Sequence, residues 1–204
     1  CEITDYNATR HCETTGNVTF RDCVITATGD WAIHFNGKTG GEVVVEGCKV
    51  TGWVAFAGSL NKVVLQDSTL YAGNYAGGRV YNKNLVIDGC IFEAGYKLDL
   101  DASDATVTVT DSKMADGTDI LNVFNKDDLC HQNDITIDGE SIAYVAKIGS
   151  VYYETLAEAL ANVADWTTIK LVANATLDYN AREAFGRLST TDIIIDGQGF
   201  TLTL

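Results

Sequence analysis

The chain has no proline and few basic residues, and both shortages limit the structures and partners that we expect. None of its 204 residues is proline, which suits strands that donate hydrogen bonds on both sides, because proline has no N–H to donate. Its 14 lysines and arginines stand against 28 aspartates and glutamates, so the net charge is −14. Nucleic acid and anionic membranes repel such a charge, and we expect neither as a partner. No run of about 18 apolar residues occurs, so no transmembrane span is expected.

Apolar residues are plentiful, at 46% of the chain. This excludes a disordered protein and predicts one elongated domain with a sizeable core. The acidic balance by itself indicates solubility and names no partner. The chain starts at Cys1 with neither a methionine nor a signal peptide, so we expect a mature or excised sequence.

An eight-residue pattern recurs seven times. Its copies start at Val18, Val43, Val63, Leu85, Val107, Ile135 and Ile193. The first and third positions are always apolar, which at a period of two puts both on one face of a strand. The fifth position is always Asp or Gly, which tolerate a left-handed backbone, and the eighth is apolar again. Each copy therefore predicts a strand, a left-handed corner and a second inward residue.

The spacing of the copies indicates a solenoid. Over the first six copies the starts are 25, 20, 22, 22 and 28 residues apart, and a period of about 20 to 50 residues marks repeat proteins. We predict an all-β fold: a single-stranded, right-handed parallel β-helix with about 22 residues per coil. Between the copies, second strands are expected at 31–35, 53–56, 98–100 and 121–123. Trp31 and Trp53 should then stack on adjacent coils.

The repeat resembles the right-handed parallel β-helix, or pectin-lyase-like, superfamily over residues 1–145 and 167–204. This resemblance is specific for the fold and not for one activity. The run from Val145 to Leu177 is similar to the opening segment of large bacterial surface β-helix proteins, in which a short strand and a helix cap the first coil. The expected organisation is therefore β-helix coils over 1–145, and over 146–204 the helix-capped start of a further β-helix segment. That segment would pack on the same solenoid or on a neighbouring subunit.

One stretch, from Val151 to Asp165, predicts a helix. Thr155 and Glu158 have the spacing of a capping box. The apolar stripe that follows consists of Leu156, Ala159, Leu160 and Val163. We expect a short capping helix near 155–164, lying as a lid over an open solenoid end.

Most of the six cysteines fall at one repeat position. Cys23, Cys48 and Cys90 stand sixth in their copies, where Ser68 and Ser112 stand in two others, and Cys1 fits the same position of an incomplete copy. Stacked small side chains are expected there, since free cysteine packs as a small hydrophobe. Strands about 4.8 Å apart would also permit Cys1–Cys23 or Cys23–Cys48 disulfides, although reduced thiols are our expectation. Cys12 and Cys130 are the better candidates for a bridge, with each other or with other partners.

A search for chemistry assigns no catalytic and no cofactor-binding residue. Enzymes of the resembled superfamily mostly cleave acidic polysaccharides, but neither the pectate-lyase pattern nor the Gly-His-Gly and Arg-x-Lys of polygalacturonases occurs, and none of the three histidines stands in such a motif. Asp99, Asp101 and Asp104 have the alternating oxygens of a calcium site. They lack a glycine turn and a distal Glu, so a solvated corner is the alternative. No other metal or cofactor is expected.

Two sets of surface residues remain as candidates. Tyr71, Tyr75, Tyr81 and Tyr96 fall on two or three coils and form either a sugar-stacking platform or half-buried strand residues. Asn7, Asn17 and Asn174 are glycosylation acceptors if the source glycosylates secreted proteins.

The expected function is that of a non-enzymatic, extracellular or cell-surface structural β-solenoid. It would stack end to end into a filament or form part of a tandem-repeat surface protein, because an unfinished coil exposes unpaired N–H and C=O groups. The expected assembly edges are Cys1, Ile3, Phe200, Leu202 and Leu204, and the partner is another copy or a flanking repeat. The alternatives are a glycan-binding adhesin, a polysaccharide-degrading β-helix domain, and a segment of a larger enzyme whose site lies elsewhere.

Overall fold

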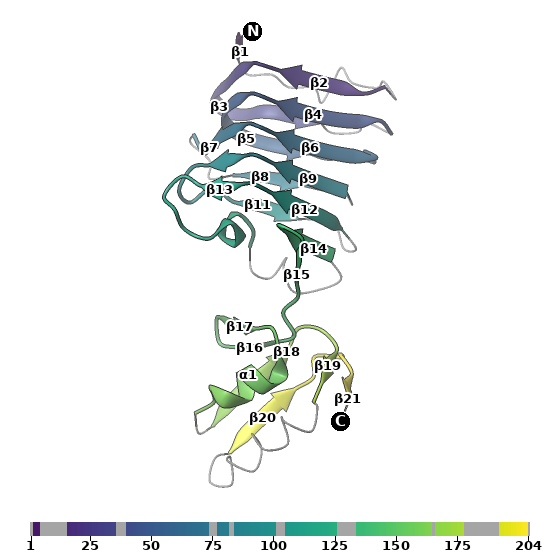
Figure 1. Ribbon diagram of the computed structural model, residues 1–204, viewed down its shortest axis with the longest axis vertical. Helices are drawn as coiled ribbons and strands as arrows, with labels where there is room; N and C mark the ends of the chain where they lie inside the picture. Colours follow the sequence, from purple (N-terminus) through teal and green to yellow (C-terminus); the bar gives the residue numbers. More distant parts are fainter. Residues whose placement is uncertain are drawn as a thin grey trace. The chain divides into compact units, whose positions relative to one another are not determined.

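The computed structural model describes residues 2–4, 16–35, 40–73, 77–81, 84–100, 105–125, 134–164, 166–177 and 192–203. For 2–4 and 28–30 only the backbone is described. The described residues divide into two compact units, one up to Ser141 and one from Ile142 on. The first holds a stack of β-coils, and the second holds smaller sheets and the helix α1 (Leu156–Ala161) (Figure 1).

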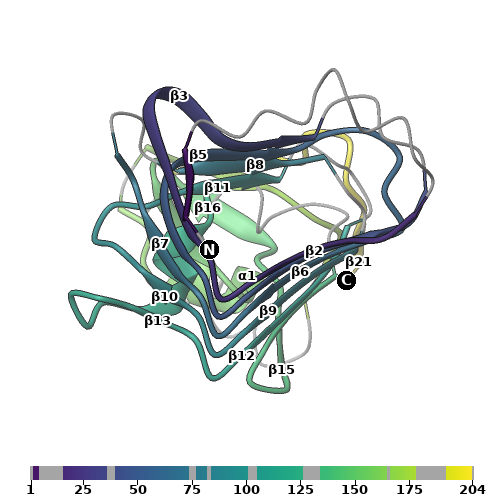
Figure 2. The same cartoon turned by 90° about the horizontal axis from the view of Figure 1, so that it is seen from above.

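Each coil of the first unit carries strands on up to three faces (Figure 2). The first face is built from β2 (Val18–Arg21), β4 (Glu42–Glu46), β6 (Lys62–Gln66), β9 (Asn84–Asp88), β12 (Thr106–Thr110) and β14 (Asp134–Ile137). The second face contains β1 (Glu2–Thr4), the opening residues of β3 (Val24–Phe35) and β5 (Lys49–Phe56), then β7 (Thr69–Tyr71), β10 (Ile91–Phe92) and β13 (Lys113–Met114). The third face contains the closing residues of β3 and β5 with β8 (Gly78–Val80) and β11 (Leu98–Leu100).

The repeat positions stack in register. Val43 pairs with Val18 on one side and Val63 on the other, and Leu85 pairs with Val63 and Val107, all in parallel strands. The stack has about 6 turns, with equivalent strands about 22 residues apart. Seen from its N-terminal end, the chain winds clockwise away from the viewer (Figure 2). The predicted right-handed parallel β-helix is therefore confirmed.

Alternation at period two builds the core of the first unit. Inside the stack the inward residues of the first face are shielded from solvent, and among them Val45, Leu65 and Ile87 have no exposed surface. Burying one such side chain contributes about 1.5–3 kcal/mol. On the third face Phe35 pairs with Phe56, with ring centroids 6.4 Å apart. One row of equivalent positions thus supplies one continuous strip of core.

The sixth copy of the repeat departs from the predicted corner. Asp138 and Gly139 are both left-handed, with φ of 48° and 87°, and β15 (Glu140–Ile142) lies next to β14. Two successive left-handed residues make the tight turn of an antiparallel hairpin, whereas a coil corner needs only one. Ile142 is half-buried. The copy at Ile135 therefore folds back on itself, and β15 is the outermost described strand of that sheet.

The prediction of a strand at 121–123 is also wrong. Ile120–Val123 form a 3₁₀ helix, η2. At its start the N–H of Leu121 donates a hydrogen bond to the Asp119 carboxylate at 2.9 Å. A short polar side chain that bonds nearby backbone competes with ladder pairing in this way. The coil is nevertheless kept in place, because Phe124 is buried and forms a parallel bridge with Leu98.

The second unit begins with antiparallel pairing and continues with parallel pairing. The strand β16 (Ala146–Ile148) pairs antiparallel with both β17 (Val151–Tyr153) and β18 (Thr167–Leu171). The strand β18 pairs in parallel with β20 (Ile193–Asp196), and β19 (Ala175–Thr176) with β21 (Leu202–Thr203). Coil geometry, with two strands per turn, therefore starts at β18.

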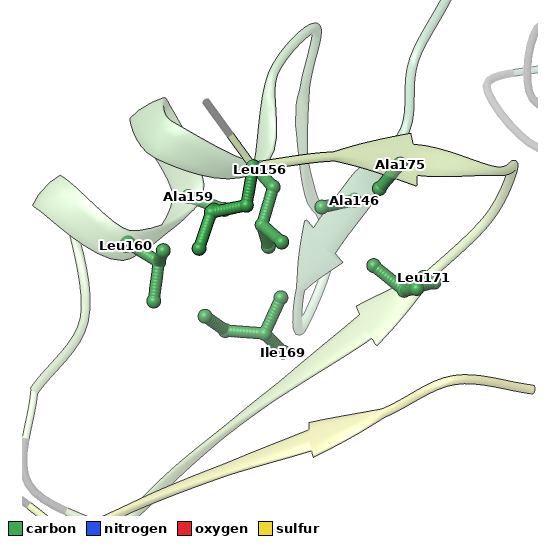
Figure 3. Close-up of a cluster of buried hydrophobic side chains, with 8 residues drawn as sticks. Ala146, Leu156, Ala159, Leu160, Ile169, Leu171 and Ala175 are labelled. Atoms are coloured by element: carbon green, nitrogen blue, oxygen red, sulfur yellow. The ribbon is translucent and has the colours of Figure 1, made fainter. Parts of the chain in front are cut away.

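The helix is shorter than predicted but starts as predicted. Both hydrogen bonds of the capping box form: Glu158 N donates to Thr155 Oγ1 at 3.1 Å, and Thr155 N to Glu158 Oε2 at 3.3 Å. The helix ends at Ala161, and the residues from Val151 belong to a strand. Its apolar face, including Leu156 and Leu160, lies over Ile169 (Figure 3). The stripe thus fills the core of the second unit.

The seventh copy shifts its corner by one residue. Gly197, predicted to be left-handed, is not, and Gln198 and Gly199 take positive φ values of 48° and 89° instead. Phe200 N donates to Gly197 O at 2.7 Å and closes this turn. The Asp/Gly position is therefore a coil corner only in the first five copies.

Candidate functional site

The corner after the first face has one repeated geometry, and we call its fourth- and fifth-position residues the acidic corner. The fifth residues of the first five copies have φ between 47° and 63°. In the first four copies, the N–H of the fifth residue donates to the carbonyl of the fourth-position residue on the next coil. Asp22 N donates to Glu46 O at 3.0 Å, and Asp67 N donates to Asp88 O at 2.8 Å. The left-handed residue therefore turns the chain without breaking the ladder.

Side-chain size alternates along the acidic corner. A Cβ built on Gly47 would lie 2.6 Å from Asp22 Oδ1, and one built on Gly89 would lie 2.5 Å from Asp67 Oδ1. Asp22 and Asp67 therefore each occupy the space next to a glycine on the following coil. This packing explains why glycine follows aspartate at Gly47 and Gly89.

Charge alternates as well. Where the fifth residue is Gly, the fourth is an acid (Glu46, Asp88, Asp138), and where the fifth is Asp, the fourth is Arg21, Gln66 or Thr110. Each coil carries one carboxylate at this corner, and successive coils place it alternately in the fourth and the fifth position. Like charges directly opposite each other are destabilising, and this zigzag keeps them apart.

The first coil carries the only cation of the acidic corner. Arg21 Nη2 lies 2.9 Å from Glu46 Oε2, and its Nε donates to the same oxygen at 2.9 Å. The Arg21 side chain is 65% exposed, so the pair contributes about 0–1 kcal/mol to stability. Its guanidinium remains accessible at the outermost described strand of the first face.

The sixth-position column is a hydrogen-bond ladder and more than a packing row. Three of its side chains accept the N–H of their equivalent on the preceding coil: Cys48 Sγ accepts from Cys23 N at 3.4 Å, Ser68 Oγ from Cys48 N at 3.0 Å and Ser112 Oγ from Cys90 N at 2.9 Å. Each also donates to the carbonyl two residues earlier, as Ser68 does to Gln66 O at 2.7 Å. Cys and Ser recur there because both supply a donor and an acceptor on a small side chain.

The three column thiols are reduced, as expected. Cys23, Cys48 and Cys90 are free and buried. Burial raises the pKa of the Cys90 thiol from 9.0 to about 11, and it also raises the pKa of Cys48. Such thiols are poor nucleophiles, because the thiolate is the reactive form. Cys1, Cys12 and Cys130 lie outside the described residues, so the predicted bridges are not tested.

An aromatic stack on the third face is confirmed. The Trp31 and Trp53 rings have centroids 4.0 Å apart and the Trp31 and His34 rings 4.1 Å, with interplanar angles of 13° and 15°. Two flat rings this close to one indole must lie on its opposite faces, so His34 and Trp53 cover both faces of Trp31. A sugar needs an open ring face for stacking, and Trp31 offers none.

The calcium candidate is only partly described, because Asp101 and Asp104 lie outside the described residues. Asp99 is occupied by protein: its Oδ2 lies 3.7 Å from Arg79 Nε, and its Oδ1 accepts a hydrogen bond from Asn125 Nδ2. Within the part of the chain that the structure describes, no three His, Cys, Asp or Glu side chains form a group suited to a metal ion.

The four candidate tyrosines do not form one platform. Tyr96 is fully buried against Phe92, with ring centroids 5.6 Å apart, so its ring cannot face a surface sugar. Tyr81 is 38% exposed beside Arg79, whose Nη1 donates to the Tyr81 hydroxyl at 3.1 Å. Tyr71 ends β7 on the second face and is half-buried. Tyr75 lies outside the described residues.

The predicted assembly edges fall on outer strands. Ile3 belongs to β1, which pairs with β3 on one side and is outermost among the described strands of its sheet. Leu202 lies in β21 and is half-buried, as is Phe200 just before it. Cys1 and Leu204 lie outside the described residues. The sequence analysis did not single out Arg21 on the outer strand β2 or Asp196 on the outer strand β20. Both residues stand at the fourth repeat position.

Within the described residues, no helix is long and apolar enough to cross a membrane. The chain matches no family model, no curated protein and no solved structure.

Proposed function

We propose that this chain is a structural β-solenoid of the cell exterior, extended by further coils that pair with its outer parallel strands. Those coils come from a second copy or from flanking repeats of the same polypeptide. The location outside the cell rests on the resemblance of residues 145–177 to the opening segment of bacterial surface β-helix proteins.

The observation that carries this proposal is a contrast between the ends of each unit. The first unit has the hairpin β14–β15 at one end of its first-face sheet and the parallel strand β2 at the other. The second unit has the antiparallel strands β16 and β17 at one end and the parallel strand β20 at the other. A hairpin or helix ends a stack, whereas a parallel outer strand is a template for another coil.

Burial supports the same distinction. Ile193 and Ile195 of β20 are only half-buried, whereas the equivalent Val63 and Leu65 within the stack have no exposed surface. A further coil on β20 would cover these two side chains. Ile194, on the opposite side of β20, is 56% exposed.

Unlike ends that pair generate an open array and not a closed dimer. We therefore expect chains that join head to tail and lengthen with concentration. Sedimentation velocity over a wide concentration range should show mass rising in steps of one chain, and negative-stain electron microscopy should show rods of variable length.

A fusion of two copies through a flexible linker separates the two sources of further coils. Linking raises the effective concentration of the second edge, so slow amide exchange of β2 in the second copy reports stacking even if free chains do not associate. Association of free chains supports the filament, and protection only in the fusion supports a tandem array. A constant one-chain mass together with unprotected β2 amides in the fusion overturns the proposal.

A further inference from the structure

We propose that β20 of a second copy, with the Gly197 that follows it, pairs in parallel with the outer edge of β2. The register follows the repeat: Ile193 opposite Val18, Ile195 opposite Phe20, Asp196 opposite Arg21 and Gly197 opposite Asp22. This inference rests on the proposed function and adds the partner strand, its register and its contacts.

Strand direction and position allow the pairing. On its inner side β20 already pairs in parallel with β18, as β2 does with β4, so each has its other edge directed away from its own sheet. The strand β20 belongs to the last described coil of its unit and β2 to the first coil with a first-face strand. Stacking one on the other therefore preserves the chain direction along the solenoid.

Charge selects this register. Arg21 is the one cation among the fourth-position residues, and Asp196 is the fourth residue of the seventh copy. Arg21 already contacts Glu46 on the coil after it. Because the guanidinium has five N–H donors in a planar fork, it can also reach a carboxylate on the coil before it. Asp196 would then flank Arg21 on the side opposite Glu46.

Size selects the same register. Within the stack, an aspartate at the fifth position neighbours glycine, and a Cβ on the following glycine would overlap the aspartate oxygen. The aspartate side chain thus lies toward the next coil, so an aspartate on the coil before Asp22 would overlap the Cβ of Asp22, whereas Gly197 has no side chain to do so. The pair Asp196-Gly197 also continues the zigzag, because a coil with its acid in the fourth position precedes one with its acid in the fifth.

The apolar row fits as well. Ile193 and Ile195 are half-buried, as is Val18 on β2. In the proposed register these side chains continue the inward row that Val43, Val45 and their equivalents form inside the stack. Pairing would therefore remove apolar surface from water on both chains.

On the second face the joint meets β1. The strand β21 follows β20 around a turn, as β3 follows β2, and β1 occupies the place beside Val24–Thr26 that β21 would take. The β1 pairing is only three residues long, so we expect β1 to give way. Deleting residues 1–4 should then strengthen the association.

Charge reversal in the full chain tests the register. Arg21→Asp places like charges at the joint, as does Asp196→Arg, and each variant alone should associate about tenfold more weakly. Mixed in equal amounts, the two variants have opposite charges at every joint, so association should return with strict alternation of the chains. To measure that alternation, one variant is isotope-labelled, the mixture is cross-linked, and mass spectrometry determines whether each dimer contains one labelled and one unlabelled chain. Gly197→Asp, which sets two aspartates side by side, should also block association.

Matched controls change the same charges away from the joint. Asp88→Arg lies at an inner coil of the acidic corner and Lys49→Asp on the exposed side of β5, and both should retain association. Circular dichroism and amide exchange of β6 establish that each variant is folded. If neither Arg21→Asp nor Asp196→Arg changes the association, this inference is overturned, although end-to-end stacking in another register is not. Single-variant losses that mixing does not restore also overturn it, and a wild-type chain that never stacks removes both proposals.

Discussion

The Oδ1 atom of Asp67 lies 2.5 Å from the place where Gly89, one coil further on, would carry a Cβ atom. The two residues are equivalent in the repeat and left-handed, with φ of 47° and 62°. Backbone conformation alone would therefore allow either residue at either site, and contact between coils decides which one stands where.

Gly89→Ala should be strongly destabilising. The left-handed backbone costs alanine about 1–2 kcal/mol, and overlap with Asp67 adds about 1–3 kcal/mol. The double variant Asp67→Gly/Gly89→Ala should recover the overlap part, which urea unfolding of the four proteins of this cycle measures. Gly117→Ala, at φ 75° with nothing within 4 Å of its Cβ, should show the backbone part only. Equal losses at both sites would refute the packing explanation.

Ser68→Ala should lower the free energy of unfolding by about 1–3 kcal/mol, because the buried N–H of Cys48 loses its acceptor. Ser68→Cys keeps a donor and an acceptor and should be nearly neutral. Chemical denaturation of both variants checks this. If alanine and cysteine are tolerated equally, the column is a packing row alone.

Tyr96→Phe should stabilise the protein by about 1 kcal/mol. The Tyr96 hydroxyl is buried without a hydrogen-bond partner among the described residues, and an unsatisfied buried polar group is costly. Tyr81→Phe is the control, since that hydroxyl accepts from Arg79 at a half-exposed site. A loss of stability on Tyr96→Phe would show that the hydroxyl has a partner in solution.

Stability should fall from about pH 9 to pH 11 through Cys90. Its pKa is raised from 9.0 to about 11 in the folded chain, so over this range the unfolded chain releases the proton while the folded chain retains it. The contribution of the neutral Cys90 thiol to the free energy of unfolding is complete below pH 9. It is lost as the pH rises toward 11, which lowers that free energy by about 2–3 kcal/mol. The slope of unfolding free energy against pH should be shallower in Cys90→Ser. Identical slopes would exclude Cys90 as the cause.

Association should strengthen as salt is raised from low levels to about 0.15 M. Each copy carries a net charge of −14, and the repulsion between copies is screened beyond about 8 Å at that ionic strength. Light scattering at increasing sodium chloride concentrations measures this. Asp88→Arg lowers the net negative charge and should flatten the dependence, whereas dissociation on adding salt would mean that the joint is held mainly by ion pairs.

Coil stacking follows from the sequence to the extent that it rests on local rules. Leu85 and Ile87 point inward because side chains alternate along a strand, and Thr155 starts a helix because its hydroxyl reaches the N–H of Glu158. The hairpin at Asp138-Gly139 was not predicted, because the same Asp-Gly pair serves as a corner at Asp88-Gly89 and as a two-residue turn here. Which form wins depends on what the next segment pairs with.

The sequence by itself determined the period, the inward rows and the left-handed corner, since each is a property of a few neighbouring residues. Tertiary structure decided that Arg21 meets Glu46, that Asp67 covers Gly89, that Cys48 N–H is satisfied by Ser68, and that Tyr96 is buried. The first three relations join residues about one coil apart, and they exist only after the backbone ladder has set one coil against the next in a single register.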